Sequence, residues 1–157
     1  MILQCSSVQS KLQNRRSSVH HKEFELAAEF ERDSLYLADW PLCQLRLQND
    51  ANYPWFILIP RRVGMVEIID LTQTEQNQLW RESAHLSVFI KAQFQAKKLN
   101  IAALGNMVPQ LHLHHIVRYD TDCAWPAPVW GKVPALAYTK EALERLKQKM
   151  ALLAVPT

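Results

Sequence analysis

Hydrophobic and polar positions alternate over several short stretches of this chain, which is typical of β-strands with one buried face. The clearest stretch spans residues 42–48, where Leu45 and Leu47 share one face and the polar residues between them lie on the other. Asn-Asp-Ala-Asn at 49–52 indicates a turn by composition. On this pattern we predict strands at residues 34–38, 42–48, 55–59, 100–104 and 110–118.

Two longer segments carry the 3.6-residue period of amphipathic helices. Thr72 and Glu75 have capping-box spacing, so we expect a helix to begin there and to run to about Lys98. His85 lies off its buried stripe, which consists of Leu79, Ser83, Leu86, Ile90 and Phe94. A second helix is expected from a cap at Thr139 to about Leu153, with a stripe of Leu143, Leu146 and Met150.

The order of these elements predicts the fold class. Three strands, a helix, two strands, a loop and a last helix indicate an α+β fold. We expect an antiparallel sheet of about five strands, with one main helix packed on it and a C-terminal helix.

Charge and length divide the chain into two parts. The length of 157 residues suits one domain. Residues 1–22 hold four of the 18 basic residues and none of the 15 acidic ones, and they contain few large apolar groups. We predict a disordered N-terminal extension there, with an organellar transit peptide as the alternative, and a single domain over 23–157. The domain keeps 14 basic and 15 acidic residues, so no nucleic-acid-binding surface is evident.

The remaining composition bears on location. No apolar run is long enough to cross a membrane. The three cysteines, Cys5, Cys43 and Cys123, are odd in number, widely spaced and without a Cys-x-x-Cys pair. This usage argues against a disulfide scaffold and predicts a cytoplasmic protein.

Most of the candidate chemistry lies in the segment from Gln110 to Arg118, which contains three of the six histidines. Because side chains alternate along a strand, we expect Gln110, His112 and His114 on one face and His115 on the other. Two imidazoles and an amide on one rigid face indicate a phosphate site or a metal site. Zinc is the weaker alternative, since no spacing singles out a third ligand among Cys43, Cys123, Asp120 and Asp122.

This segment resembles the fingerprint of the histidine triad (HIT-like) superfamily, His-x-His-x-His with apolar x after a Gly-Gln-type turn. Gly105-Asn106 stands at the turn, Arg118 follows at the family's distance, and residues 54–60 look like the strand before the main helix. The resemblance covers about residues 24–131. It places the triad at 110, 112 and 114, the first being Gln110. Trp55 stands where better-known members often have another histidine.

The resemblance implies a nucleotide hydrolase or nucleotidyltransferase that attacks the α-phosphate of a nucleotide conjugate through a nucleotidyl-histidine intermediate. Dinucleoside polyphosphates, nucleoside phosphoramidates and nucleotide sugars are the implied substrates, a homodimer is the implied assembly, and no metal or other cofactor is required. The implied residues are His112 as nucleophile, His114 as phosphate contact and proton donor, and Asn106 as a hydrogen-bond donor to a phosphate oxygen. Gln110 is implied as an assisting group, and Asn49 or Asp50 as a ribose contact.

Two other hypotheses remain. Gln110 and Trp55 replace residues that help to hold the nucleophile in better-known members, which favours a nucleotide-binding module with weak or no turnover. More remote is an interaction protein whose histidine strand is only structural. Trp125 and Trp130, in a proline-stiffened loop at 125–131, are expected to close a hydrophobic edge or a dimer seam, or alternatively to cover a nucleotide base.

Overall fold

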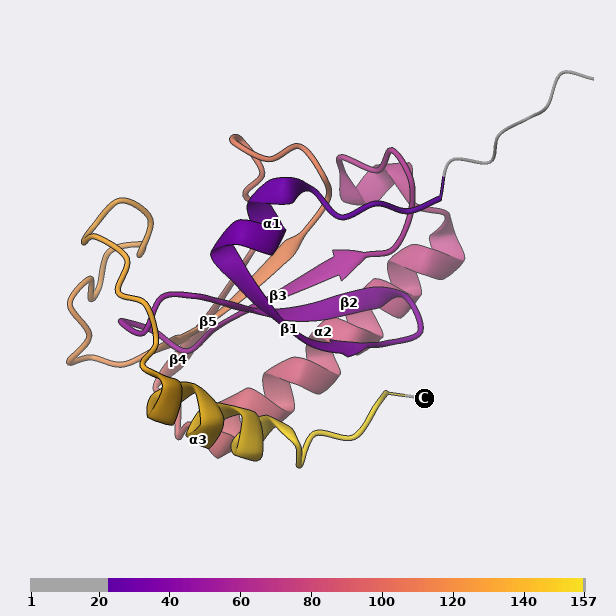
Figure 1. The fold of residues 1–157 in the computed structure, drawn as a ribbon. Helices are drawn as coiled ribbons and strands as arrows, with labels where there is room; N and C mark the ends of the chain where they lie inside the picture. Colours follow the sequence, from indigo (N-terminus) through magenta and orange to yellow (C-terminus); the bar gives the residue numbers. More distant parts are fainter. Residues whose placement is uncertain (1–22, 157) are drawn as a thin grey trace, which may run out of the picture.

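The computed structural model describes residues 23–156; the predicted N-terminal extension at 1–22 lies outside them. Five strands form one antiparallel sheet in the order β1-β2-β3-β5-β4 (Figure 1). The strands are β1 (Ser34–Asp39), β2 (Cys43–Gln48), β3 (Trp55–Pro60), β4 (Lys98–Ala102) and β5 (Leu113–Arg118). The helices are α1 (Ala28–Asp33), the 3-10 turn η1 (Ile68–Asp70), α2 (Gln73–Gln93) and α3 (Lys140–Met150). The predicted α+β architecture is confirmed.

Helices cover both faces of the sheet (Figure 1). On one face, α2 and α3 bury a core that includes Phe56 and Leu58 of β3 and Leu113 and Val117 of β5. On the other face α1 contributes Phe30, which joins Trp55 and Ile57 of β3 and Ile116 of β5. Each central strand therefore supplies alternate residues to two separate cores, as the period of a strand requires.

The main helix begins where the capping box predicts and ends before the predicted residue. The Thr72 hydroxyl accepts from the Glu75 N–H, and the Glu75 carboxylate accepts from the Thr72 N–H. The expectation that it runs to about Lys98 is wrong. Gln95 takes the left-handed conformation, with φ of 50°, and Lys98 already begins β4. Glycine is the usual residue in the left-handed conformation at a helix end. Because glutamine stands there in this chain, the sequence did not indicate where the helix ends.

The C-terminal helix follows its predicted cap but is shorter than expected. The Thr139 hydroxyl accepts from the Ala142 N–H, and α3 ends at Met150 instead of near Leu153. Leu146 and Met150 are buried against the sheet. Helix α1 was not predicted, because six residues are too few for a helical period to be recognised.

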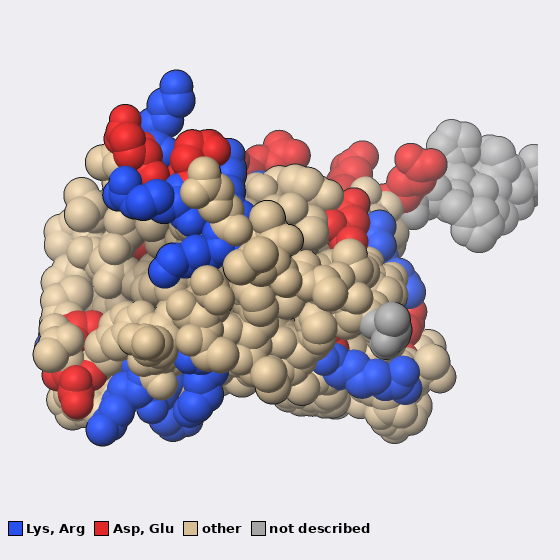
Figure 2. Space-filling model, turned by 90° about the horizontal axis from the view of Figure 1, so that it is seen from below, with Lys and Arg blue, Asp and Glu red and all other residues tan. Residues whose placement is uncertain are grey.

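The surface carries both signs of charge. On the face shown in Figure 2, Lys and Arg gather in separate groups around an uncharged centre, with groups of Asp and Glu beside them at both ends. On this face the positive charge therefore does not form the continuous stripe that binds a phosphate backbone. Within residues 23–156, no helix combines the length and the apolar character needed to span a bilayer.

His115 is buried on the face of β5 that packs against α2. Its Nδ1 lies 3.2 Å from the carbonyl oxygen of Leu113, and its Nε2 lies 2.8 Å from the hydroxyl of Ser83 in α2. A carbonyl only accepts, so Nδ1 carries the proton and the Ser83 hydroxyl donates to Nε2. His115 thus bonds the sheet to its main helix on the face opposite His114, as the strand alternation predicted.

This burial leads us to expect that acid destabilises the fold. Burial lowers the pKa of His115 to about 4 from its ordinary 6.5. Between these values the unfolded state binds more protons than the folded state. The free energy of unfolding should therefore be fully maintained above pH ~6.5. It should fall towards pH ~4, at most by roughly 1.4 kcal/mol per pH unit from this residue. Urea unfolding at a series of pH values measures the fall.

The matched variant is His115→Gln, which does not titrate. It should be less stable than the wild type at neutral pH, because the bond from Ser83 is disturbed, yet it should lose less stability on acidification. An identical pH dependence in the two proteins would contradict the assignment to His115.

Candidate functional site

His112 and His114 lie together on the face of the sheet that carries α1. His114 belongs to β5, and His112 directly precedes that strand. Their ring centroids are 4.6 Å apart with the planes at 86°, and each residue is only 5% exposed. The prediction that both imidazoles share one face is confirmed.

A backbone carbonyl orients His112. Its Nδ1 lies 2.7 Å from the carbonyl oxygen of Gln110, so Nδ1 carries the proton and donates, and Nε2 carries the lone pair. Burial lowers the pKa of His112, which keeps the ring neutral near pH 7. Phe30 of α1 packs on this ring at a centroid distance of 4.8 Å. A neutral imidazole that donates through one nitrogen and holds its lone pair on the other is suited to nucleophilic attack.

His114 has a different partner. The indole Nε1 of Trp55 donates to its Nδ1 at 2.9 Å, and its Nε2 lies 3.4 Å from the carbonyl oxygen of Leu104. Trp130 packs against the same ring at 5.3 Å. Burial, and next the neighbouring His112, lower the pKa of His114 to about 3. The ring is therefore neutral at physiological pH.

Strand register explains how Trp55 reaches His114. In the antiparallel pair of β3 and β5, Trp55 lies opposite Ile116 and Ile57 lies opposite His114. Trp55 is thus the diagonal neighbour of His114 on one face, a position that long aromatic side chains can bridge. The sequence singled out Trp55 as unusual, but only the register shows that it bonds His114.

The Gln110 side chain faces a partner that the sequence did not indicate. Its Oε1 accepts from the Ala27 N–H at 3.0 Å, and its Nε2 donates to the Glu25 carbonyl at 2.8 Å. Both ends of the amide therefore hold the segment that leads into α1. The backbone carbonyl of Gln110 bonds His112, while the polar atoms of its side-chain amide bond residues 25 and 27.

The two histidines line a cavity of about 410 Å³. Phe30, Trp55 and Trp130 form aromatic walls, and the acidic residues come from α1. No Lys or Arg occurs among the described residues of this lining. The lining consists of Glu29, Phe30, Asp33, Gln48, Trp55, Leu104, Asn106, Met107, Val108, His112, His114 and Trp130.

The turn at Gly105-Asn106 closes one side of this cavity, as its position in the motif suggested. Asn106 is exposed on the lining. A Cβ on Gly105 would lie 3.0 Å from the Val108 carbonyl oxygen and 3.5 Å from Cε1 of His112. The absence of a side chain at Gly105 therefore allows the turn to pack directly beside the His112 ring.

The predicted ribose contacts are not part of this lining. The Asn49 amide oxygen accepts from the Tyr138 N–H, and the Asp50 carboxylate accepts from the Leu136 N–H and from Asn52. These bonds tie both side chains to the segment that precedes α3 or to the turn beside it. Among the polar residues that do line the cavity are Asp33 of α1 and Gln48 of β2. Asp33 was missed because α1 was missed.

A buried ion pair fastens the loop that carries Trp130. Arg118 bonds both carboxylate oxygens of Asp122, at 2.8 and 3.1 Å, and the carbonyl of Ala127 at 2.9 Å. Trp125 lies over the guanidinium, 5.7 Å from its central carbon. Trp130 in turn packs on Trp55 at 5.4 Å. The loop thus completes the wall behind His114, and Trp130 has the position of a cavity wall.

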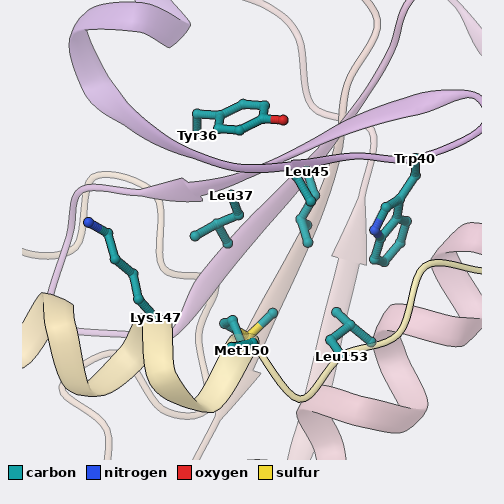
Figure 3. Close-up of a pocket in the computed structure, with 9 residues that line it drawn as sticks. Tyr36, Leu37, Trp40, Leu45, Lys147, Met150 and Leu153 are labelled. Carbon is teal, nitrogen blue, oxygen red and sulfur yellow. The ribbon is translucent and has the colours of Figure 1, made fainter.

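A second cavity, of about 310 Å³, lies between β1, β2 and the end of α3 (Figure 3). Leu37 and Leu45 point from the sheet towards Met150 (Figure 3). Lys147 at its margin pairs with Glu144, and no residue of this lining also lines the histidine cavity. Within the part of the chain that the structure describes, no three His, Cys, Asp or Glu side chains are grouped so that they could hold a metal ion.

Comparison with known proteins places this geometry in context. The HIT domain matches residues 29–121, more than half of the chain. The structure is similar to a histidine triad protein from Marinobacter aquaeolei VT8, with a TM-score of 0.82 and 46% identity over 85% of this chain and 100% of that one. It is also similar to a histidine triad protein from Bradyrhizobium japonicum, with a TM-score of 0.82 and 41% identity over 84% of this chain and 98% of that one.

Curated relatives match over a shorter stretch. Bis(5'-adenosyl)-triphosphatase from strains of Saccharomyces cerevisiae is 32% identical over 68 residues, which are 40% of this chain. The matching stretch spans a third of the length of the yeast protein. The domain match, the similar solved structures and the paired histidines on β5 together establish that this chain belongs to the histidine triad (HIT) family.

Proposed function

We propose that this protein is a nucleotide hydrolase or nucleotidyltransferase that acts on the α-phosphate of a nucleotide conjugate through a nucleotidyl-histidine intermediate. The observation that carries the proposal is the state of His112, whose Nδ1–H is bonded to the Gln110 carbonyl, so that Nε2 holds the lone pair of the neutral ring. Membership of the HIT family supports it, as does the name of the yeast relative, a triphosphatase of bis(5'-adenosyl) compounds.

The proposed reaction has two displacements. Nε2 of His112 attacks the α-phosphorus, and the bond to the leaving group breaks. Water or another acceptor then attacks the phosphorus, and His112 is regenerated. Nε2–H of His114 donates to a phosphate oxygen or to the leaving group, and the Asn106 amide and N–H groups of the turn donate to the remaining oxygens. Gln110, at the proposed first triad position, supplies the carbonyl that orients the nucleophile.

The cavity offers a place for the nucleoside. Its aromatic walls suit a base, and Asp33 and Gln48 offer acceptors and a donor to ribose hydroxyls. This assignment replaces the expected contact at Asn49 or Asp50. Residues 23–157 are proposed to act as one domain, because β5, which carries His114 and His115, contributes residues to both cores of the described chain.

A nucleotide-binding module without turnover is the second candidate function. The use of the Gln110 amide to hold residues 25–27, together with Trp55 beside His114, favours it. Under this hypothesis the cavity holds a nucleotide, but the histidines do not form a covalent bond to it.

Covalent catalysis predicts a mass change at a single residue. We expect the wild-type protein, mixed briefly with adenylyl and uridylyl donors, to gain the mass of one nucleotidyl group in intact-protein mass spectrometry. His112→Ala should show no gain, because the attacking nitrogen is absent, while nucleotide affinity measured by calorimetry stays largely intact. No adduct and no released nucleoside monophosphate after hours, with binding retained, would instead support the binding module.

The Gln110 amide should contribute to stability through the segment before α1. We expect Gln110→Ala and Ala27→Pro each to lower the free energy of unfolding by about 1 kcal/mol, since each removes the bond between these residues. Proline suits position 27, because Ala27 has φ of −62°. The double variant should lose clearly less than the sum of the single losses. Additive losses in urea unfolding would show that the two groups do not interact.

A further inference from the structure

The Trp55 indole fixes the position of the ring proton on His114. An indole nitrogen only donates, and Nε1 of Trp55 lies 2.9 Å from Nδ1 of His114. Nδ1 must therefore present its lone pair, and the single proton of the neutral ring resides on Nε2. The carbonyl oxygen of Leu104 is 3.4 Å from Nε2, a long bond that a phosphate oxygen in the cavity can replace.

Packing prevents the pair from rearranging. A second proton on His114 would have to reside on Nδ1, where it would point at the N–H of Trp55. Trp55 is 8% exposed and packs against Trp130 at 5.4 Å. The His114 ring lies between His112, at 4.6 Å, and Trp130, at 5.3 Å. If Nδ1 of His114 were protonated, its N–H and the N–H of Trp55 would face each other. Neither the Trp55 ring nor the His114 ring could then turn away without disturbing the cavity wall.

No other side chain on the lining replaces His114 as a buried proton donor. Besides the two histidines, the titratable residues there are Glu29 and Asp33 of α1. Glu29 is exposed. The hydrogen bond from Arg32 holds the pKa of Asp33 below its ordinary value, which keeps that carboxyl ionised. His112 gives no proton either, since its Nδ1–H is bonded to the Gln110 carbonyl.

This arrangement limits the leaving group. An amine leaves phosphorus only after it has gained a proton, whereas a phosphate or carboxylate oxygen leaves as a stable anion. A neutral imidazole would have to become an imidazolate to give up its Nε2 proton, so it can donate a hydrogen bond but is a poor acid. His114 is therefore equipped to stabilise the phosphate oxygens, and it is not equipped to protonate an amine.

We propose, on the basis of the function given above, that the site cleaves phosphoanhydrides in preference to phosphoramidates, with Trp55 as a positioning residue that keeps His114 a neutral hydrogen-bond donor. A bond forms between Nε2 of His112 and phosphorus as the P–O bond breaks, and its electron pair leaves on the acid oxygen. Water then attacks phosphorus, the P–N pair returns to Nε2, and the proton of water passes to solvent. The products are a nucleoside monophosphate and the free acid.

The kinetic test uses donors of equal charge. Adenosine 5′-(4-nitrophenyl phosphate) releases a stable oxyanion, like an anhydride, and adenosine 5′-phosphoramidate releases an amine. Without a general acid, the single-turnover rate should be about 10²–10⁴-fold lower for the phosphoramidate. Di(adenosine-5′) triphosphate, a true anhydride, should react as well. Similar rates for the phosphoramidate and the ester would overturn the preference while leaving nucleophilic catalysis by His112 intact.

The spectroscopic test does not need turnover. In ¹⁵N-histidine-labelled protein, with His114 identified from the spectrum of His114→Asn, we expect the neutral Nε2–H tautomer from about pH 8 to about pH 5. Trp55→Phe should lose this fixed tautomer. Trp130→Phe should keep it, because Trp130 packs on His114 but Trp55 supplies the bond to Nδ1.

The outcomes separate the two proposals. A proton on Nδ1 in the wild type, or an unchanged tautomer in Trp55→Phe, would overturn the role of Trp55. If no donor reacts although the fixed tautomer is observed, the proposed function fails and the positioning role of Trp55 stands.

Discussion

The register between β3 and β5 is the constraint on which the site depends. Pairing Ile57 with His114 places Trp55 diagonally beside that histidine and directs both towards α1. The same pairing turns His115 to the opposite face, where it bonds Ser83 of α2. A slip of one residue would exchange the two faces, burying the His112–His114 pair under α2. The hydrophobic cores on the two sides of the sheet therefore fix the strand register, and with it the face on which the His112–His114 pair lies.

Gln110 links the nucleophile to the N-terminal part of the described chain. Its carbonyl holds Nδ1 of His112, and its amide holds the backbone of residues 25–27. From there the chain enters α1, whose Phe30 packs back onto His112. The candidate nucleophile is thus held from two sides by one continuous set of contacts. The Gln110 amide thereby attaches the segment that leads into α1, one wall of the cavity.

The sequence predicts local features well and long-range contacts poorly. Alternation over residues 110–118 was enough to separate His112 and His114 from His115, and the Thr72 capping box was enough to locate the start of α2. The bond from Trp55 to His114 joins residues 59 positions apart and depends on strand order. The partners of the Gln110 amide are 83 and 85 positions away. Such contacts depend on the order and register of the strands, which a local sequence pattern does not encode.

The electrostatics of the cavity explain why the state of a single proton matters. A phosphate site usually meets negative charge with Arg or Lys, yet none occurs on the described lining, and α1 adds Glu29 and Asp33. Burial lowers the pKa of both histidines and keeps them neutral. In the proposed reaction, the phosphate charge would therefore be met by aligned N–H groups at a largely buried pair of rings, where hydrogen bonds are stronger than in water. An N–H group helps only if it points at the phosphate. By donating to Nδ1 of His114, Trp55 keeps the ring proton on Nε2. By accepting from Nδ1–H of His112, the Gln110 carbonyl leaves Nε2 of that ring without a proton.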